Sequence, residues 1–180
     1  MKQIYPQENQ LIKACQENDS QAQFELFERY KVAMFNLVYR MSYDYDLAND
    51  ILQEGFIEVF RNISKFRQES TLGAWIKKIM IRKALKQING MQLHESLETV
   101  VEVGGEMLEG WIDGEMLDQA IAQLPKGART VFVLFEVEGY THQEVAKLLQ
   151  ITESTSKSQL HYAKKLLKEL LNKELKHEKR

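Results

Sequence analysis

The sequence has little cysteine and proline, and it contains no long apolar run. Its one cysteine, Cys15, excludes an internal disulfide framework and suits a reducing compartment, so we expect a cytoplasmic protein. No stretch of 18 apolar residues occurs, and the polar residues 1–10 lack the apolar core of a signal peptide, so we expect neither a membrane span nor a leader. Two prolines in 180 residues favour long helices.

The sequence also lacks the residue groupings on which enzymes depend. Its four scattered histidines and single cysteine offer no metal-ligand spacing. It shows no paired catalytic carboxylates, no nucleophile beside a base and no phosphate-binding glycine loop. We therefore expect no enzymatic activity, no metal and no cofactor.

The net charge of −2 conceals a strong segregation of charge along the chain. Residues 61–90 carry eight basic side chains and one acidic, and residues 153–180 carry eight basic and four acidic. Between these blocks, residues 91–125 carry eight acidic side chains and no basic one. Two basic blocks indicate two contacts with polyanions, although charge alone is equally compatible with solvated helix faces.

The apolar periodicity is helical almost throughout and predicts an all-α fold of two small helical domains. We expect one domain in residues 1–89 and another in 115–180, joined by a flexible, glycine-punctuated acidic linker, 90–114. In the second helix we expect an apolar face of Phe24, Phe27, Ala33, Met34, Leu37 and Val38. In the first domain we expect helices at about 9–17, at 22–41 with Asp19 or Ser20 as the cap, from Asp44 or Asp46 to 63, and at 72–88. In the second domain we expect a helix that begins at about 115, another from Pro125 to Gly139, and two more at 141–149 and 152–174.

Residues 139–167 carry the strongest local signal, that of a helix-turn-helix. Thr141 and Glu144 have capping-box spacing, and Thr152 is a suitable N-cap for the second helix. Helical phase puts Ser156 on the buried side, so its contact there must be looser or locally hydrogen-bonded. An ordinary helical hairpin with a polar outer face is the alternative. The residues expected to face DNA are Ser154, Thr155, Lys157, Ser158 and His161.

Residues 117–171 resemble region 4 of the sigma-70 family, in particular its extracytoplasmic-function (ECF) branch. The opening Leu124-Pro125-x-x-x-Arg129-x-Val131-Phe132 is similar to the family's, and the helix-turn-helix follows at the right distance. The family's recognition helix usually reads Gly-Thr-Val-Lys-Ser-Arg, where this chain has Ser154-Thr155-Ser156-Lys157-Ser158-Gln159. Ser156 and Gln159 depart from that pattern, and Gln150 replaces a glycine common in the turn. The resemblance implies recognition of the −35 element.

The N-terminal half resembles region 2 of the same family. Asp50-Ile51-Leu52-Gln53-Glu54-Gly55-Phe56-Ile57 is similar to the helix that binds the polymerase clamp, and Asp50, Gln53 and Glu54 share one helix face. Phe66-Arg67-x-Glu69-Ser70-x-x-x-Ala74-Trp75-Ile76 resembles the loop and helix that read and melt the −10 element. Trp75 is either a core residue or a base platform. The DNA-binding residues predicted here are Arg67, Ser70, Trp75, Lys78, Arg82 and Lys86.

The resemblance implies a sigma factor. Such a protein binds core RNA polymerase at the clamp and flap, and directs promoter-specific initiation through the −10 and −35 elements. It also implies control by an anti-sigma factor, which nothing in the sequence identifies. A stand-alone helix-turn-helix regulator that binds DNA without polymerase is the alternative, and a helical adaptor is a third class.

Overall fold

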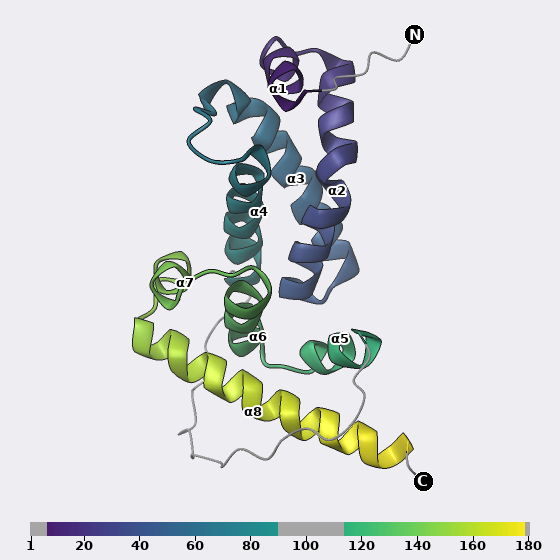
Figure 1. Ribbon diagram of the computed structural model, residues 1–180, viewed down its shortest axis with the longest axis vertical. Helices are drawn as coiled ribbons and strands as arrows, with labels where there is room; N and C mark the ends of the chain where they lie inside the picture. Colours follow the sequence, from purple (N-terminus) through teal and green to yellow (C-terminus); the bar gives the residue numbers. More distant parts are fainter. Residues whose placement is uncertain (1–6, 90–113, 179–180) are drawn as a thin grey trace. The chain divides into compact units, whose positions relative to one another are not determined.

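The computed structural model describes residues 7–89 and 114–178, and within them it contains helices and no strand (Figure 1). The chain forms two compact units, Met1–Met91 and Gln92–Arg180. The all-α prediction is confirmed. The predicted acidic linker, 90–114, lies outside the described residues except for Gly114.

The N-terminal unit is a bundle of long helices. Helices α2, α3 and α4 each pack against the other two, and α1 packs against α2 and against the 3₁₀ turn η1 (Figure 1). The elements are α1 (Glu8–Gln16), α2 (Ser20–Ser42), α3 (Tyr45–Asn62), η1 (Ile63–Lys65) and α4 (Leu72–Asn89).

Aspartate caps begin both α2 and α3. The Asp19 carboxylate accepts hydrogen bonds from the backbone N–H groups of Gln21 (2.8 Å) and Ala22 (2.9 Å). The Asp44 carboxylate accepts one from the N–H of Leu47 at 3.0 Å. Each cap satisfies N–H groups that have no partner within the helix. The sequence left two possible caps open for each helix, and the structure selects Asp19 and Asp44.

The predicted apolar face of α2 is partly wrong. Met34, Leu37 and Val38 are buried as expected, but Ala33 is exposed and Phe24 is 55 % exposed. Successive helical residues are rotated by about 100°, so the face that buries Ala22 and Leu26 turns Phe24 outward. Phe27 is half-buried.

Helices α3 and α4 approach closely where Gly55 faces Met80. A Cβ atom on Gly55 would overlap Met80 Sδ and would lie 2.8 Å from Met80 Cε. Met80 is fully buried, so its side chain has little room to move away. Gly73 plays a similar part between α4 and α2, since its missing Cβ would lie 3.0 Å from the ring of Tyr30.

The C-terminal unit is arranged along one long helix. Helix α8 packs against α5, α6 and α7, which lie along its length (Figure 1). Buried Arg129 joins α6 to α5, because its Nη1 donates a hydrogen bond to the Ala122 carbonyl at 2.9 Å. The elements are α5 (Gly114–Ala122), α6 (Lys126–Phe132), the π-helical segment η2 (Val133–Val137), α7 (His142–Leu149) and α8 (Glu153–Glu178).

The helix expected between Pro125 and Gly139 is present but changes its winding. Pro125 is the N-cap of α6, and Gly139 follows the end with a left-handed φ of 75°. The last five residues, Val133–Val137, are π-helical, which the sequence pattern did not predict.

Neither a membrane-spanning helix nor a metal-binding cluster is found in the part of the chain that the structure describes. None of its helices combines the length and hydropathy of a bilayer span. No group of three or more His, Cys, Asp or Glu side chains within residues 7–89 and 114–178 is arranged to hold a metal ion.

The contact between Gly55 and Met80 generates a stability prediction. Gly55→Ala should lower the free energy of unfolding by about 1–3 kcal/mol, because the added methyl group overfills a packed interface. Gly114→Ala is the matched control: its Cβ would meet no atom within 4 Å, and the stability should change by less than about 0.5 kcal/mol. Chemical denaturation followed by circular dichroism measures both. Equal stability of Gly55→Ala and the parent chain would contradict the proposed close packing.

Candidate polymerase and nucleic-acid interfaces

The three residues predicted to bind polymerase lie together on the outside of α3. Asp50, Gln53 and Glu54 are all exposed, while their neighbours Ile51 and Leu52 are buried. The spacing of three and four residues therefore produces one acidic, solvent-facing patch, as the sequence predicted.

One member of this patch is tied to the neighbouring helix by Lys83 of α4. Lys83 Nζ lies 3.6 Å from Glu54 Oε2 and 3.1 Å from Glu58 Oε2. The hydrogen bond to Glu58 is the main reason that the pKa of Lys83 is raised above its ordinary value. Lys83 was not among the residues predicted from the sequence, because the pairing depends on how α3 and α4 face each other. The positive charge of Lys83 is therefore directed toward the carboxylates of α3.

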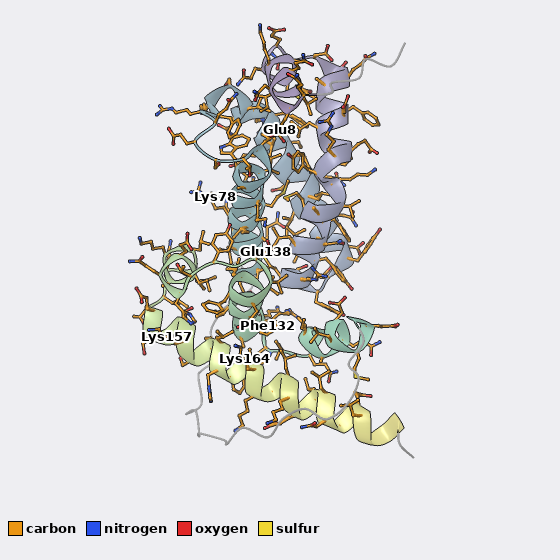
Figure 2. The ribbon with its side chains drawn as sticks, in the orientation of Figure 1. Glu8, Lys78, Phe132, Glu138, Lys157 and Lys164 are labelled. Carbon is orange, nitrogen blue, oxygen red and sulfur yellow. The ribbon has the colours of Figure 1, made fainter. Side chains whose placement is uncertain are left out.

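Three other basic residues of α4 form an outward-facing stripe. Lys78, Arg82 and Lys86 are exposed, and Figure 2 shows Lys78 projecting away from the helix. Within residues 7–89, none of the three is ion-paired. Ile79 and Leu85 of the same helix are buried. The stripe is thus an exposed positive surface of the kind that follows phosphates.

Two of the predicted DNA-binding residues lie on the loop before α4, and Phe66 of the same loop packs against a third, Trp75. Arg67 and Ser70 are exposed. Phe66 is buried, and its ring centroid lies 5.3 Å from that of Trp75 at an interplanar angle of 45°. Trp75 is half-buried, so part of its ring packs against Phe66 and the rest faces solvent. The indole is therefore packed against the core on one side without being fully buried.

The predicted helix-turn-helix is formed by α7 and α8. Thr141 and Glu144 make the complete capping box, with Thr141 N–H donating to Glu144 Oε2 at 2.9 Å. Gln150 turns the chain in the left-handed conformation, φ 57° and ψ 40°, which accounts for glycine at this position in similar sequences. Thr152 then caps α8 by accepting from the Thr155 N–H at 3.0 Å.

The five predicted reading residues of α8 differ in accessibility. Ser154, Lys157 and His161 are exposed, and Figure 2 shows Lys157 near the end of α8 closest to α7. Thr155 and Ser158 are half-buried and already hydrogen-bonded. Thr155 Oγ1 lies 2.8 Å from Thr152 Oγ1, and Ser158 Oγ donates to the Thr155 carbonyl at 3.0 Å. Lys157, Ser154 and His161 are therefore the side chains most available to a ligand.

Ser156 is buried, as its helical phase predicted, and its hydrogen-bond partner lies in the other helix. Its side chain is 0 % exposed, and its Oγ lies 2.9 Å from Nδ1 of His142 in α7. His142 was not predicted as the partner, because 14 residues separate it from Ser156 and no spacing rule connects them.

Comparison with known protein families identifies both units. The family model described as Sigma-70 region 2 matches residues 26–91, and the one described as Sigma-70, region 4 matches residues 114–167. The chain belongs to the sigma-70 family. The order of the two regions along the chain agrees with the resemblance found in the sequence.

Relatives of full length narrow this assignment to the ECF branch. The RNA polymerase sigma-H factor of Pseudomonas aeruginosa is 26 % identical over 183 residues, covering 92 % of this chain and 94 % of the relative. The ECF RNA polymerase sigma factor SigW of Bacillus subtilis is 27 % identical, covering 89 % of this chain and 94 % of the relative. The protein is accordingly an ECF sigma factor that binds core RNA polymerase and directs promoter-specific transcription initiation. A stand-alone regulator is not favoured.

Solved structures agree with the fold of this sigma factor. The sigma factor RpoE of Bartonella quintana, in complex with the anti-sigma factor NepR, matches with a TM-score of 0.57 and 20 % identity, covering 82 % of this chain and 95 % of RpoE. CnrH in complex with the cytosolic domain of CnrY matches with a TM-score of 0.55 and 17 % identity, covering 92 % of this chain and 97 % of the matched chain.

The exposed stripe on α4 generates a prediction about salt dependence. Replacing both Arg82 and Lys86 by Ala should weaken holoenzyme binding to promoters of any sequence. It should also flatten the plot of log affinity against log salt by roughly one unit per lost phosphate contact. Lys83→Ala, which removes one positive charge, is the control on the same helix, and it should leave the slope unchanged because Lys83 faces α3. An unchanged slope in the double variant would mean that the stripe does not face DNA.

Proposed function

We propose a division of labour between the two units of this sigma factor. Residues 1–89 bind the polymerase clamp and the −10 element, residues 115–180 bind the polymerase flap and the −35 element, and residues 90–114 connect them. The observation that carries the proposal is the pair of oppositely charged surfaces on the N-terminal unit. An acidic patch on α3 and a basic stripe on α4 suit one protein partner and one nucleic-acid partner.

In this proposal the acidic patch binds the clamp. Asp50, Gln53 and Glu54 offer carboxylate and amide groups on a rigid helix, which suits recognition by basic side chains. Glu54 already has a partner in Lys83, so Asp50 and Gln53 are the residues most free to engage polymerase.

The basic stripe and the preceding loop bind the −10 element. Lys78, Arg82 and Lys86 contact phosphates, and Arg67 and Ser70 lie on the loop that receives unstacked bases. The accessible part of Trp75 supplies a surface on which a base stacks.

The first turns of α8 read the −35 element in the major groove. Lys157 is the strongest candidate for a base contact, because its side chain is exposed and long enough to reach a guanine or a neighbouring phosphate. Ser154 and His161 lie exposed on the same end of the helix, and Thr155 and Ser158 complete the surface.

We further infer that the chain acts in the cytoplasm, has no catalytic activity of its own and is sequestered by an anti-sigma factor. RNA synthesis belongs to core polymerase, whose promoter choice the sigma factor directs. The anti-sigma inference draws on RpoE, which was solved together with the anti-sigma factor NepR.

Charge reversal on α3 tests the clamp contact. Asp50→Lys combined with Glu54→Lys should weaken assembly with core polymerase severalfold, because two attractive charges become repulsive. Helicity and thermal stability should change little, since both side chains are exposed. Asp50→Lys alone avoids disturbing Lys83, and Glu17→Lys on an exposed site outside α3 is the matched control. Fluorescence anisotropy of labelled protein with core enzyme measures assembly; unaltered binding by the α3 variants would reject the clamp assignment.

A second experiment tests the reading of the −35 element by α8. Lys157→Ala should reduce −35 discrimination in run-off transcription from a randomised −35 library by about tenfold, since one good base contact contributes about 1–3 kcal/mol. Lys164→Ala is the matched control: Lys164 lies two turns further along α8 and pairs with Glu136 at 2.7 Å (Figure 2). If wild type and Lys157→Ala select the same sequences with equal strength, Lys157 does not read DNA.

A further inference from the structure

A partly buried polar contact joins the two helices of the helix-turn-helix. Ser156, in the first turn of α8, is 0 % exposed, and its hydroxyl lies 2.9 Å from Nδ1 of His142, the first residue of α7. A buried hydroxyl without a partner is unfavourable, so the imidazole is what makes a serine tolerable at this position.

The imidazole of His142 is itself held on a second side. Its ring stacks on Phe135 of η2, with ring centroids 4.2 Å apart and an interplanar angle of 25°. One face of the ring is thus fixed by an aromatic contact while its edge meets the Ser156 hydroxyl. Three successive segments, η2, α7 and α8, are joined through a single side chain.

Among the described residues of α7 and α8, the buried side chains other than Ser156 are apolar. Val145, Ala146, Leu160 and Ala163 are buried, and such apolar packing is non-directional. A hydrogen bond, in contrast, weakens steeply when its angle changes. The contact of His142 with Ser156 therefore resists small rotations of the first turn of α8.

The location of Ser156 makes such rotations matter. It lies between Thr155, which is half-buried, and Lys157, which is exposed. Because helical residues are rotated by about 100° from one to the next, fixing the direction of Ser156 fixes the directions of both neighbours. A rotation of the first turn would change the direction in which Lys157 leaves the helix, and a hydrogen bond to a base weakens as its angle changes.

We infer that His142 and Ser156 are positioning residues for promoter reading: their hydrogen bond, supported by Phe135, sets the orientation of the recognition helix. Neither residue needs to touch DNA for this. The inference rests on the proposed function of the C-terminal unit, which assigns −35 recognition to α8. It adds that the strength of sequence discrimination is set by a contact behind the reading surface.

The contact is suited to positioning rather than to switching. A serine hydroxyl donates to an unprotonated imidazole nitrogen and accepts from a protonated one. The hydrogen bond therefore forms with either tautomer of His142.

Two substitutions of His142 separate the hydrogen bond from the bulk of the side chain. In His142→Asn the amide group lies about where Nδ1 was, so a hydrogen bond to Ser156 is retained. In His142→Gln the amide lies further out, about where Nε2 was, so the hydrogen bond to Ser156 is lost, although the glutamine side chain is larger than that of asparagine. Ser156→Ala removes the hydroxyl from the other side.

The test is run-off transcription by reconstituted holoenzyme on a randomised −35 library. We compare the transcript yield from the preferred −35 sequences with the average yield over the library. Ser156→Ala and His142→Gln should each reduce this ratio by about three- to tenfold, the effect of one net hydrogen bond. His142→Asn should stay close to wild type. The double variant His142→Gln with Ser156→Ala should lose no more than either single variant, because both remove one contact.

A structural control separates positioning from loss of stability. Leu171→Ala removes a buried side chain far along α8 and should lower the melting temperature at least as much as Ser156→Ala, while −35 discrimination is kept. If discrimination falls with melting temperature across all variants, or if His142→Gln and His142→Asn behave alike, the inference is overturned. If wild type itself shows no −35 preference, the proposed function fails. If wild type discriminates and Ser156→Ala does so equally well, only the positioning inference fails.

Discussion

The close packing of α3 on α4 determines what the N-terminal unit can present to a partner. Because Gly55 lets the backbone of α3 come against Met80, the two helices bury one face each and must turn their other faces outward. The outer face of α3 is acidic and that of α4 is basic, so one packing contact exposes two surfaces of opposite charge. Lys83 crosses between them and pairs with Glu54 and Glu58, which keeps its positive charge off the basic stripe.

In the C-terminal unit, polar contacts determine how the helix-turn-helix is arranged. Helix α7 has only eight residues, and a helix of this length is marginal without end caps and tertiary packing. The capping box of Thr141 with Glu144 fixes its start, left-handed Gln150 fixes its end, and Thr152 starts α8. The geometry of the turn is thus determined by local hydrogen bonds, while the apolar contacts with α8 supply the stability.

Helix positions and exposed faces followed from the sequence where a local rule applied. Asp19, Asp44, Thr141 and Thr152 cap helices because their side chains reach N–H groups two or three residues away, a relation visible in sequence. The exposed sites at Asp50, Arg82 and Lys157 also followed, since three- and four-residue spacing defines a helix face.

Contacts between different helices could not be predicted from the sequence by such local rules. The partners Lys83 with Glu58 and His142 with Ser156 are separated by 25 and 14 residues, and only the packed fold brings them together. Phe24 was placed on the wrong face because hydrophobicity alone does not choose between two adjacent arcs of a helix. The π-helical winding of Val133–Val137 likewise has no signature in the apolar pattern.

The single cysteine has a practical chemical consequence. Cys15 is fully buried in α1, and burial, together with the nearby negative charges of Asp19 and Glu25, raises the pKa of its thiol to about 11. At neutral pH only about one thiol in ten thousand is then ionised, and the thiolate is the form that reacts with oxidants and alkylating agents. The folded chain consequently offers almost no background reactivity toward maleimide dyes. A cysteine introduced at an exposed position, such as Ser154 on the recognition surface, becomes a selective point of attachment for a fluorophore.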